Sequence, residues 1–150
     1  MYKIEIPNMN LKQIADSGQC FRWKEMESAG TLKYSIVAFG KYLEIEQDGQ
    51  MFTLSCDEDE WNEVWRGYFD MDTDYEDIKR RIEESDDDHL KLAFEKGNGI
   101  RILKQDLWEI IVSFIISQNN NIKRITKSVD DLCTRSGYLC DGEKTGYRFP

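Results

Sequence analysis

The segment from Leu107 to Ile116 constrains the fold more than any other part of the chain. All of its residues except Glu109 and Ser113 are apolar, so a helix built from it is hydrophobic on nearly every side. Such a helix belongs in the centre of a packed bundle, and Asp106 with Glu109 gives it a capping-box start. The next segment has only one apolar helical face, formed by Ile122, Ile125, Val129 and Leu132. Because too few helices remain to surround the apolar segment, we expect a chain that stops inside a helical domain.

The first half of the chain indicates an antiparallel sheet with one short helix. Apolar or alternating segments separated by turn residues predict strands at residues 2–6, 19–23, 32–39, 42–46 and 51–55. Gly40 and the Asp48–Gly49 pair supply hairpin turns. Asn10 is placed to cap a short helix that ends at Gly18. Sequential strands joined by tight turns make the sheet antiparallel.

The hydrophobic period changes from two to 3.6 after Cys56. Asp57 with Glu60 forms a capping-box pattern, and Trp61 and Trp65 follow at helical spacing, which indicates a core stripe packed against the sheet rather than a ligand site. Two further helices are predicted at residues 75–84 and 87–95, and an irregular chain is expected after Cys133. In these two helices, Ile78, Ile82, Leu90 and Phe94 are expected to face the core.

The composition excludes membrane and secreted proteins but leaves nucleic-acid binding open. A chain of 150 residues forms about one domain. No segment reaches the roughly 18 apolar residues of a membrane span, and residues 1–12 are too polar for a secretory signal, so we expect a soluble, intracellular protein. The net charge of −9 is uneven: residues 57–90 carry four basic and fifteen acidic groups, whereas residues 91–150 carry ten and seven. The acidic block is expected to be a solvated face that points away from any ligand.

The cysteine and histidine content argues against a metal centre. The four cysteines form no CxxC pair, and His89 is the single histidine, so neither a zinc site nor a histidine-based catalytic triad is expected. His89 itself is expected on the surface. We expect reduced thiols, and a Cys133–Cys140 disulfide stays open as the alternative. No metal and no cofactor follow from this inventory.

Three consecutive asparagines, Asn119, Asn120 and Asn121, separate the apolar helix from the amphipathic one. Asparagine favours left-handed C-caps and N-caps, but ending one helix and starting another needs one or two such residues. The excess amide groups stand directly before Lys123 and Arg124, near a helix N-terminus that attracts anions. This combination indicates a surface that reads a polar, negatively charged polymer.

Two motifs resemble the N-terminal half of the 8-oxoguanine DNA glycosylases, which belong to the helix-hairpin-helix glycosylase superfamily. They are GQCFRW at Gly18–Trp23 and QDLWEIIVSFIISQNNNIKRI at Gln105–Ile125, and the GIRIL segment at Gly99–Leu103 agrees with them. The resemblance implies an α+β fold for residues 1–104, an antiparallel sheet with flanking helices similar to half of the TATA-binding protein. Residues 105–150 would then be the incomplete start of the helix-hairpin-helix glycosylase domain.

The resemblance also implies roles for single residues. Glycosylases of this kind flip the damaged nucleotide out of the duplex, and Asn119 and Arg124 would hold the cytosine that is left behind. Asn120 and Asn121 would shape the turn that inserts Asn119, and Lys123 would contact a phosphate or remain in solvent.

The resemblance gives Gly18 a role on the lesion side. Its backbone carbonyl would recognise the N7–H that oxidation gives to guanine. The alternative is that Gly18 only ends the short helix in a left-handed cap. Arg22 is open between a phosphate contact and a surface salt bridge, while Phe21 and Trp23 are expected to alternate into the core.

The family's catalytic lysine and aspartate have no counterpart in this chain, because no Gly-rich hairpin follows Asn121. Lys104, Lys127 and Lys144 are not candidates for that role, so the resemblance predicts a DNA glycosylase/AP lyase for the full-length protein and no activity for these 150 residues alone. The predicted partner is double-stranded DNA with 8-oxoguanine opposite cytosine, and the predicted location is the cytoplasm, with the nucleoid, in a bacterium.

Two other functions stay open, a non-catalytic module that binds nucleic acid or protein and a glycosylase for another lesion on the same scaffold. Both motifs favour 8-oxoguanine over another lesion. The uncovered apolar helix argues against a stand-alone module, and it predicts non-physiological self-association of the fragment.

Overall fold

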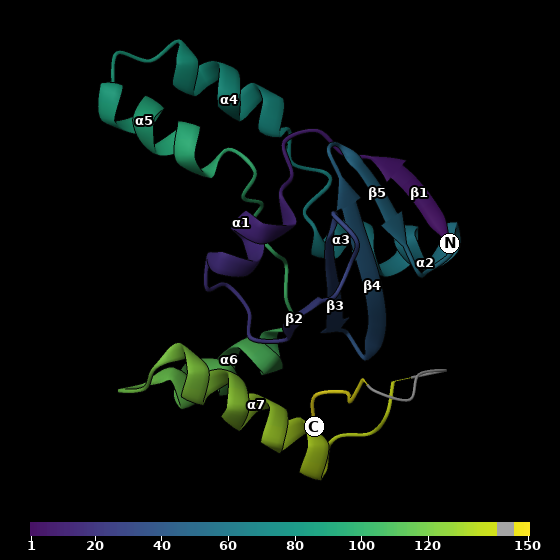
Figure 1. Ribbon diagram of the computed structural model, residues 1–150. Coiled ribbons are helices and arrows are strands. Elements are labelled where there is room, and N and C mark those ends of the chain that lie inside the picture. The colour runs from purple at the N-terminus through teal and green to yellow at the C-terminus, as the bar shows by residue number, and fades with distance from the viewer. Residues whose placement is uncertain (141–145) are drawn as a thin grey trace.

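The computed structural model describes residues 1–140 and 146–150, and its centre is a five-stranded antiparallel sheet. The strands lie in the order β1-β5-β4-β3-β2 (Figure 1). Their bounds are Tyr2–Glu5 for β1, Trp23–Met26 for β2, Leu32–Ala38 for β3, Lys41–Asp48 for β4 and Met51–Leu54 for β5. This arrangement confirms the predicted α+β class and the antiparallel sheet.

The hairpin turns follow the sequence closely. Ala38 pairs with Lys41, so Phe39 and Gly40 form a two-residue turn with φ of 50° and 73°. Positive φ at both positions matches the twist of the strands. The next turn uses Gly49 and Gln50, because Asp48 already pairs with Met51.

One predicted strand is wrong. Residues 19–22 form no strand, and β2 starts only at Trp23. The reason is local: Gln19 and Arg22 turn their side chains inward to bond with residues after position 100, which removes the alternation that a strand requires.

The larger of two hydrophobic cores covers one face of the sheet. Alternate residues of β3, β4 and β5 are buried there, and they pack with α1 (Leu11–Asp16) and with a continuous helical run made of α2 (Glu58–Glu60), η1 (Trp61–Trp65) and α3 (Arg66–Tyr68). Trp61 and Trp65 are almost completely buried, which confirms them as core residues. Asn10 and Asp57 cap these helices as predicted, accepting from the N–H groups of Gln13 and Glu60. The π-helical turn at Trp61–Trp65 was not predicted from the sequence.

The first half of the acidic block contributes to α2, η1 and α3, and its second half lies in a helical hairpin that projects from the molecule. Its helices α4 (Tyr75–Glu83) and α5 (Asp88–Gly97) contain no buried residue, and Figure 1 shows them extending away from the sheet at the end opposite α6 and α7. His89 is exposed, as predicted. The predicted burial of Leu90 is wrong, since 43% of it is exposed, and Ile78 is exposed as well. Because the two helices pack mainly on each other, only part of their apolar surface is covered.

The last two helices lie together below the sheet in Figure 1. They are α6 (Leu107–Ser117) and α7 (Ile122–Ser136), so α7 continues past Cys133, where an irregular chain was expected. A second, smaller core joins Ile125, Val129 and Cys133 of α7 to Phe21 and to partly buried residues of α6 and the C-terminal segment. Ile122 is 64% exposed, contrary to the prediction, because it stands at the open end of α7.

The apolar helix α6 is mostly uncovered. Ser113 is its one buried residue, while Leu107, Phe114 and Ile115 are each more than 60% exposed. We predicted that this helix lies in the centre of a bundle. The described residues cover only one side of it. Cys20, Cys56 and Cys133 form no disulfide with any residue that the structure describes, and burial raises the pKa of Cys20 to about 12. In the part of the chain that the structure describes, no helix has the length and apolar character needed to cross a membrane.

Candidate nucleic-acid interface

The asparagine turn between α6 and α7 uses two of its three side chains for helix ends. The Asn120 amide donates to the carbonyl of Ile116 at 3.1 Å, and its backbone N–H donates to Ser117, which closes the end of α6. The Asn121 side chain accepts from the N–H of Arg124 at 3.1 Å and thereby caps α7. Asn120 and Asn121 therefore close α6 and cap α7, which agrees with the prediction that the triplet separates two helices.

Asn119 differs from its two neighbours. It is exposed and left-handed, with φ of 51°, a conformation that asparagine tolerates better than most residues. Its side-chain amide forms no hydrogen bond with any residue that the structure describes. One amide with both a donor and an acceptor is thus presented to solvent at the tip of the turn.

Two cations follow the turn on the exposed side of α7. Lys123 and Arg124 are exposed, and within residues 1–140 and 146–150 neither side chain forms an ion pair. Lys127, one turn later, is paired with Asp131 at 3.7 Å. The two unpaired cations stand beside the N-terminus of a 15-residue helix, which adds a positive potential for a phosphate or a base edge.

Gly18 lies directly after α1 and its C-cap residue Ser17. It has φ of 76°, and a Cβ atom there would touch nothing within 4 Å. The backbone angle, and not space, therefore requires glycine. The left-handed cap is present, as one of the two interpretations proposed. At the same time, the Gly18 carbonyl accepts no hydrogen bond from the described residues, so it remains available to a donor from outside.

Two cavities beside Gly18 extend toward the end of α6 and the start of α7. One, of about 250 Å³, lies between the Gly18 segment and α6, and its lining includes Gly18, Glu109, Ser113 and Ser117. The other, of about 440 Å³, lies toward α7, and Gly18 lines it together with Ile122. Ser117 is the last residue of α6 and Ile122 is the first residue of α7. Gly18 therefore shares a cavity with each of the two helix ends that the turn joins, although 101 positions separate Gly18 from Asn119; none of the three asparagines lines either cavity.

Three polar residues, Arg22, Glu109 and Gln19, form an internal network near Gly18 that the sequence did not predict. The Arg22 guanidinium is only 7% exposed and lies 3.5 Å from the Glu109 carboxylate; it also donates to the backbone carbonyl of Tyr147. Arg22 is thus neither a phosphate contact nor a surface salt bridge. Burial raises the pKa of Glu109, and Arg22 opposes that rise. Gln19 bonds to the chain at residues 101–105. From the sequence, Glu109 was expected only as the partner of Asp106 in a capping box.

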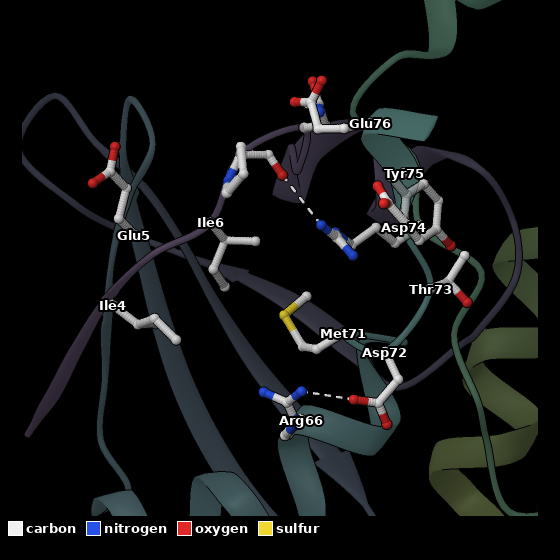
Figure 2. A pocket seen from close by; sticks show the side chains of 13 residues that line it. Ile4, Glu5, Ile6, Arg66, Met71, Asp72, Thr73, Asp74, Tyr75 and Glu76 are labelled. Atoms are coloured by element: carbon white, nitrogen blue, oxygen red, sulfur yellow. Dashed lines mark hydrogen bonds and ion pairs between the residues drawn. The ribbon is translucent and has the colours of Figure 1, made fainter. Parts of the chain in front are cut away.

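A third cavity, of about 380 Å³, lies between the end of β1 and the start of α4. Figure 2 shows the side chains of Ile6 and Met71 inside it and the ion pair of Arg66 with Asp72 at its border. None of the predicted site residues lines it. Next to it, Arg101 is buried under the Tyr75 ring and donates to the carbonyls of residues 7 and 70, which explains the inward-facing arginine of the GIRIL segment. Among the described residues, no group of acidic, histidine or cysteine side chains could hold a metal ion.

Known proteins resemble this chain in both sequence and structure. A sequence model described as the 8-oxoguanine DNA glycosylase N-terminal domain matches residues 1–111. This chain belongs to that family. The N-glycosylase/DNA lyase of Saccharomyces cerevisiae is 32% identical over 141 residues, which cover 86% of this chain and 37% of the yeast protein.

Solved structures extend the family relationship to the whole chain. MBOgg1 in complex with a low-affinity DNA ligand has a TM-score of 0.88 and 38% identity, over 99% of this chain and 50% of that one. The Clostridium acetobutylicum 8-oxoguanine glycosylase/lyase, bound to double-stranded DNA with cytosine opposite 8-oxoG, has a TM-score of 0.85 and 37% identity, over 100% of this chain and 54% of that one. The glycosylase-family chain described here thus spans 37% of its yeast relative and about half of these solved chains.

Proposed function

We propose that this chain recognises damaged DNA as the N-terminal part of a bifunctional DNA glycosylase/AP lyase that removes 8-oxoguanine opposite cytosine. The partner is double-stranded DNA that contains this base pair. The observation that carries the proposal is that the two cavities lined by Gly18 extend to Ser117 at the end of α6 and to Ile122 at the start of α7, the two helix ends that the asparagine turn joins. Family membership supports the reaction class, and the DNA complex of the Clostridium relative supports the substrate.

In this proposal the turn between α6 and α7 holds the cytosine that loses its partner. Cytosine presents O2 and N3 as acceptors and an amino group as a donor. The Arg124 guanidinium supplies donors only, whereas the Asn119 amide both donates and accepts. The exposed, unbonded state of both side chains among the described residues supports this role, because neither has to break an internal bond before it contacts DNA. Lys123 would add a phosphate contact without base preference.

Gly18 would recognise the lesion through its backbone. Guanine N7 is a hydrogen-bond acceptor, whereas oxidation at C8 makes N7 a donor, so one correctly placed carbonyl favours the lesion over guanine. The Gly18 carbonyl accepts no hydrogen bond from the described chain, so no internal donor competes with the N7–H of the lesion. The absence of a side chain at position 18 permits close approach.

We assign no catalytic residue to this chain. Lys104 is bonded to the buried Asp70 at 2.6 Å, and Lys127 is paired with Asp131; Lys144 lies outside the described residues. Residues 1–104 would form the N-terminal domain, and residues 105–150 would begin the catalytic helical domain. An enzyme of this kind works where the chromosome lies, which in a bacterium is the cytoplasm, with the nucleoid.

A chimera tests the proposal. Residues 1–150 replace the matching part of the Clostridium acetobutylicum glycosylase/lyase, which supplies the rest of the catalytic architecture. We expect excision of 8-oxoguanine with a preference for cytosine over adenine opposite the lesion. Arg124→Ala should reduce that preference by about 1–3 kcal/mol, the value of one good bidentate base contact.

Lys123→Ala is the matched control, since Lys123 is the exposed cation next to Arg124. It should weaken DNA binding by the same factor for both opposite bases and make the binding less dependent on salt. Equal excision opposite cytosine and adenine by the parent chimera would refute the assigned base preference. Excision of an alkylated base in place of 8-oxoguanine would refute the assigned lesion.

A further inference from the structure

The GQCFRW segment carries two polar side chains that face the protein interior. Gln19 donates to the carbonyl of Arg101 at 2.9 Å and accepts from the N–H of Leu103 at 2.9 Å, while its own carbonyl accepts from Gln105 at 2.7 Å. Three positions later, Arg22 reaches Glu109. The non-regular segment that begins at Gly18 is therefore attached along its length to the connector and helix that lead to the asparagine turn.

The ion pair between Arg22 and Glu109 is the most buried attachment of this set. The two side chains are 7% and 12% exposed, which means that both charges are largely removed from water. Burial of a charge pair contributes little stability compared with apolar residues of the same volume, since desolvation offsets the attraction. A buried pair does fix the relative orientation of the two segments that carry it, because a guanidinium forms a planar fork with a fixed geometry.

This ion pair lies between the two elements that we propose contact DNA, which are Gly18 and the asparagine turn. Glu109 stands in the first turn of α6 and lines the same cavity as Gly18. The helix then runs to Ser117, a length of about 16 Å for its 11 residues, and ends at the asparagine turn. A rigid helix fixed to the Gly18 segment at its start therefore sets the distance between Gly18 and Asn119.

We propose that Arg22 and Glu109 are positioning residues whose buried ion pair holds the Gly18 carbonyl in register with Asn119, so that the lesion and its partner base are read by one rigid unit. This inference rests on the proposed function. It assigns Arg22 no contact with DNA. A carbonyl that must meet one N–H has to be held within roughly 0.5 Å by its surroundings, and a glycine in a loop cannot hold itself.

The first test separates positioning from simple stability in the chimera. Arg22→Met/Glu109→Leu replaces the pair by apolar side chains of similar size, so the melting temperature should remain close to that of the parent. We expect kcat for 8-oxoguanine opposite cytosine to fall at least tenfold with little change in KM, and the preference for cytosine over adenine to fall with it. Parent values of kcat and of the preference in a folded variant would overturn the inference.

Two single variants complete this test. Arg22→Lys keeps the charge without the fork and should recover part of the lost kcat; a value equal to the parent would overturn the inference, whether or not the apolar pair folds. Lys12→Gln removes an exposed ion pair with Asp16 in the helix before Gly18 and should leave kcat unchanged. A parent chimera that does not excise 8-oxoguanine would refute the proposed function, whereas an active parent with equally active variants would refute only this inference.

The second test needs no activity and uses the 150-residue chain itself. Nitroxide labels on the exposed positions of Asp16→Cys and Lys123→Cys report the distance between the end of α1 and the start of α7. With the ion pair intact the distance distribution should be narrow, and in Arg22→Met/Glu109→Leu it should broaden. An unchanged distribution would overturn the inference even where kcat falls, because the loss would then have another origin.

Discussion

The three asparagines should separate into structural and functional residues when they are replaced one at a time. Asn121 caps α7 through its side chain, whereas the Asn119 amide forms no bond within the described chain and only its left-handed backbone is part of the fold. Asn121→Ala therefore removes a cap. Asn119→Gly removes the amide but keeps a residue that adopts φ of 51° without strain.

The structure gives these two changes different magnitudes. Loss of an asparagine N-cap costs about 1 kcal/mol of stability, which corresponds to a fall in melting temperature of about 2–4 °C for a chain of this size. An exposed position with no side-chain partner changes stability by about 0.5 kcal/mol or less in either direction. For base discrimination the order reverses: Asn119→Gly should lose about 1–3 kcal/mol, roughly 5- to 150-fold in the cytosine preference.

Both quantities can be measured on the same proteins. Urea unfolding followed by far-UV circular dichroism gives the free energy of unfolding of the 150-residue chain, and single-turnover excision by the chimera gives the ratio of rates opposite cytosine and adenine. Asn121→Ala should change the first and leave the second within about threefold, a shift of less than 0.7 kcal/mol. Equal destabilisation by Asn119→Gly and Asn121→Ala would refute the division of roles, and so would an unchanged base preference in Asn119→Gly.

Three further predictions concern the chain alone. The uncovered face of α6 should cause it to form dimers or aggregates that Phe114→Glu reduces; sedimentation at high concentration checks this, and a wild-type monomer would contradict it. Borohydride should trap no covalent adduct with DNA that contains 8-oxoguanine, and a trapped adduct would show that a nucleophile lies within these residues. Burial raises the pKa of Glu109 despite Arg22, so the folded chain holds this proton more tightly than the unfolded chain, where the pKa is roughly 4.3. Stability should therefore fall as pH rises from there through the raised pKa of Glu109. Urea midpoints between pH 4 and 7 should lose this slope in Glu109→Gln, and parallel curves for the two proteins would contradict the assignment.

Local signals in the sequence predicted most of the elements. Asn10, Asp57 and Asp106 were identified as helix caps from their positions before apolar periodic segments, and each accepts the expected backbone N–H group. Gly40 was identified as a turn residue because it adopts positive φ at low cost. Such features depend on residues within four positions of each other, so one sequence contains all the information they need.

The errors arise where distant residues decide. The interval 19–23 alternates like a strand, yet Gln19 and Arg22 bond to partners more than 80 positions away. Leu90 was expected to be buried because its helix is amphipathic, but the sequence does not state that the hairpin projects from the sheet and has little to pack against. Propensity and periodicity give the inward side of a helix only if another element lies there.

The candidate site depends on local sequence motifs and on contacts between distant residues. Its residues could be predicted from the motifs, whereas its geometry could not. Asn119, Arg124 and Gly18 stand in the two motifs that resemble the glycosylase family, and that resemblance made each of them a candidate. In our proposal their relative position depends on Arg22 and Glu109, which are ordinary charged residues in a sequence with many others, and only their burial distinguishes them. Residues that contact a ligand from an exposed turn need particular side chains. The residues that position them need only form a contact with each other. In this fold Arg22 and Glu109 stand out because both charges are buried, which is energetically costly. Burial is known only from the folded structure.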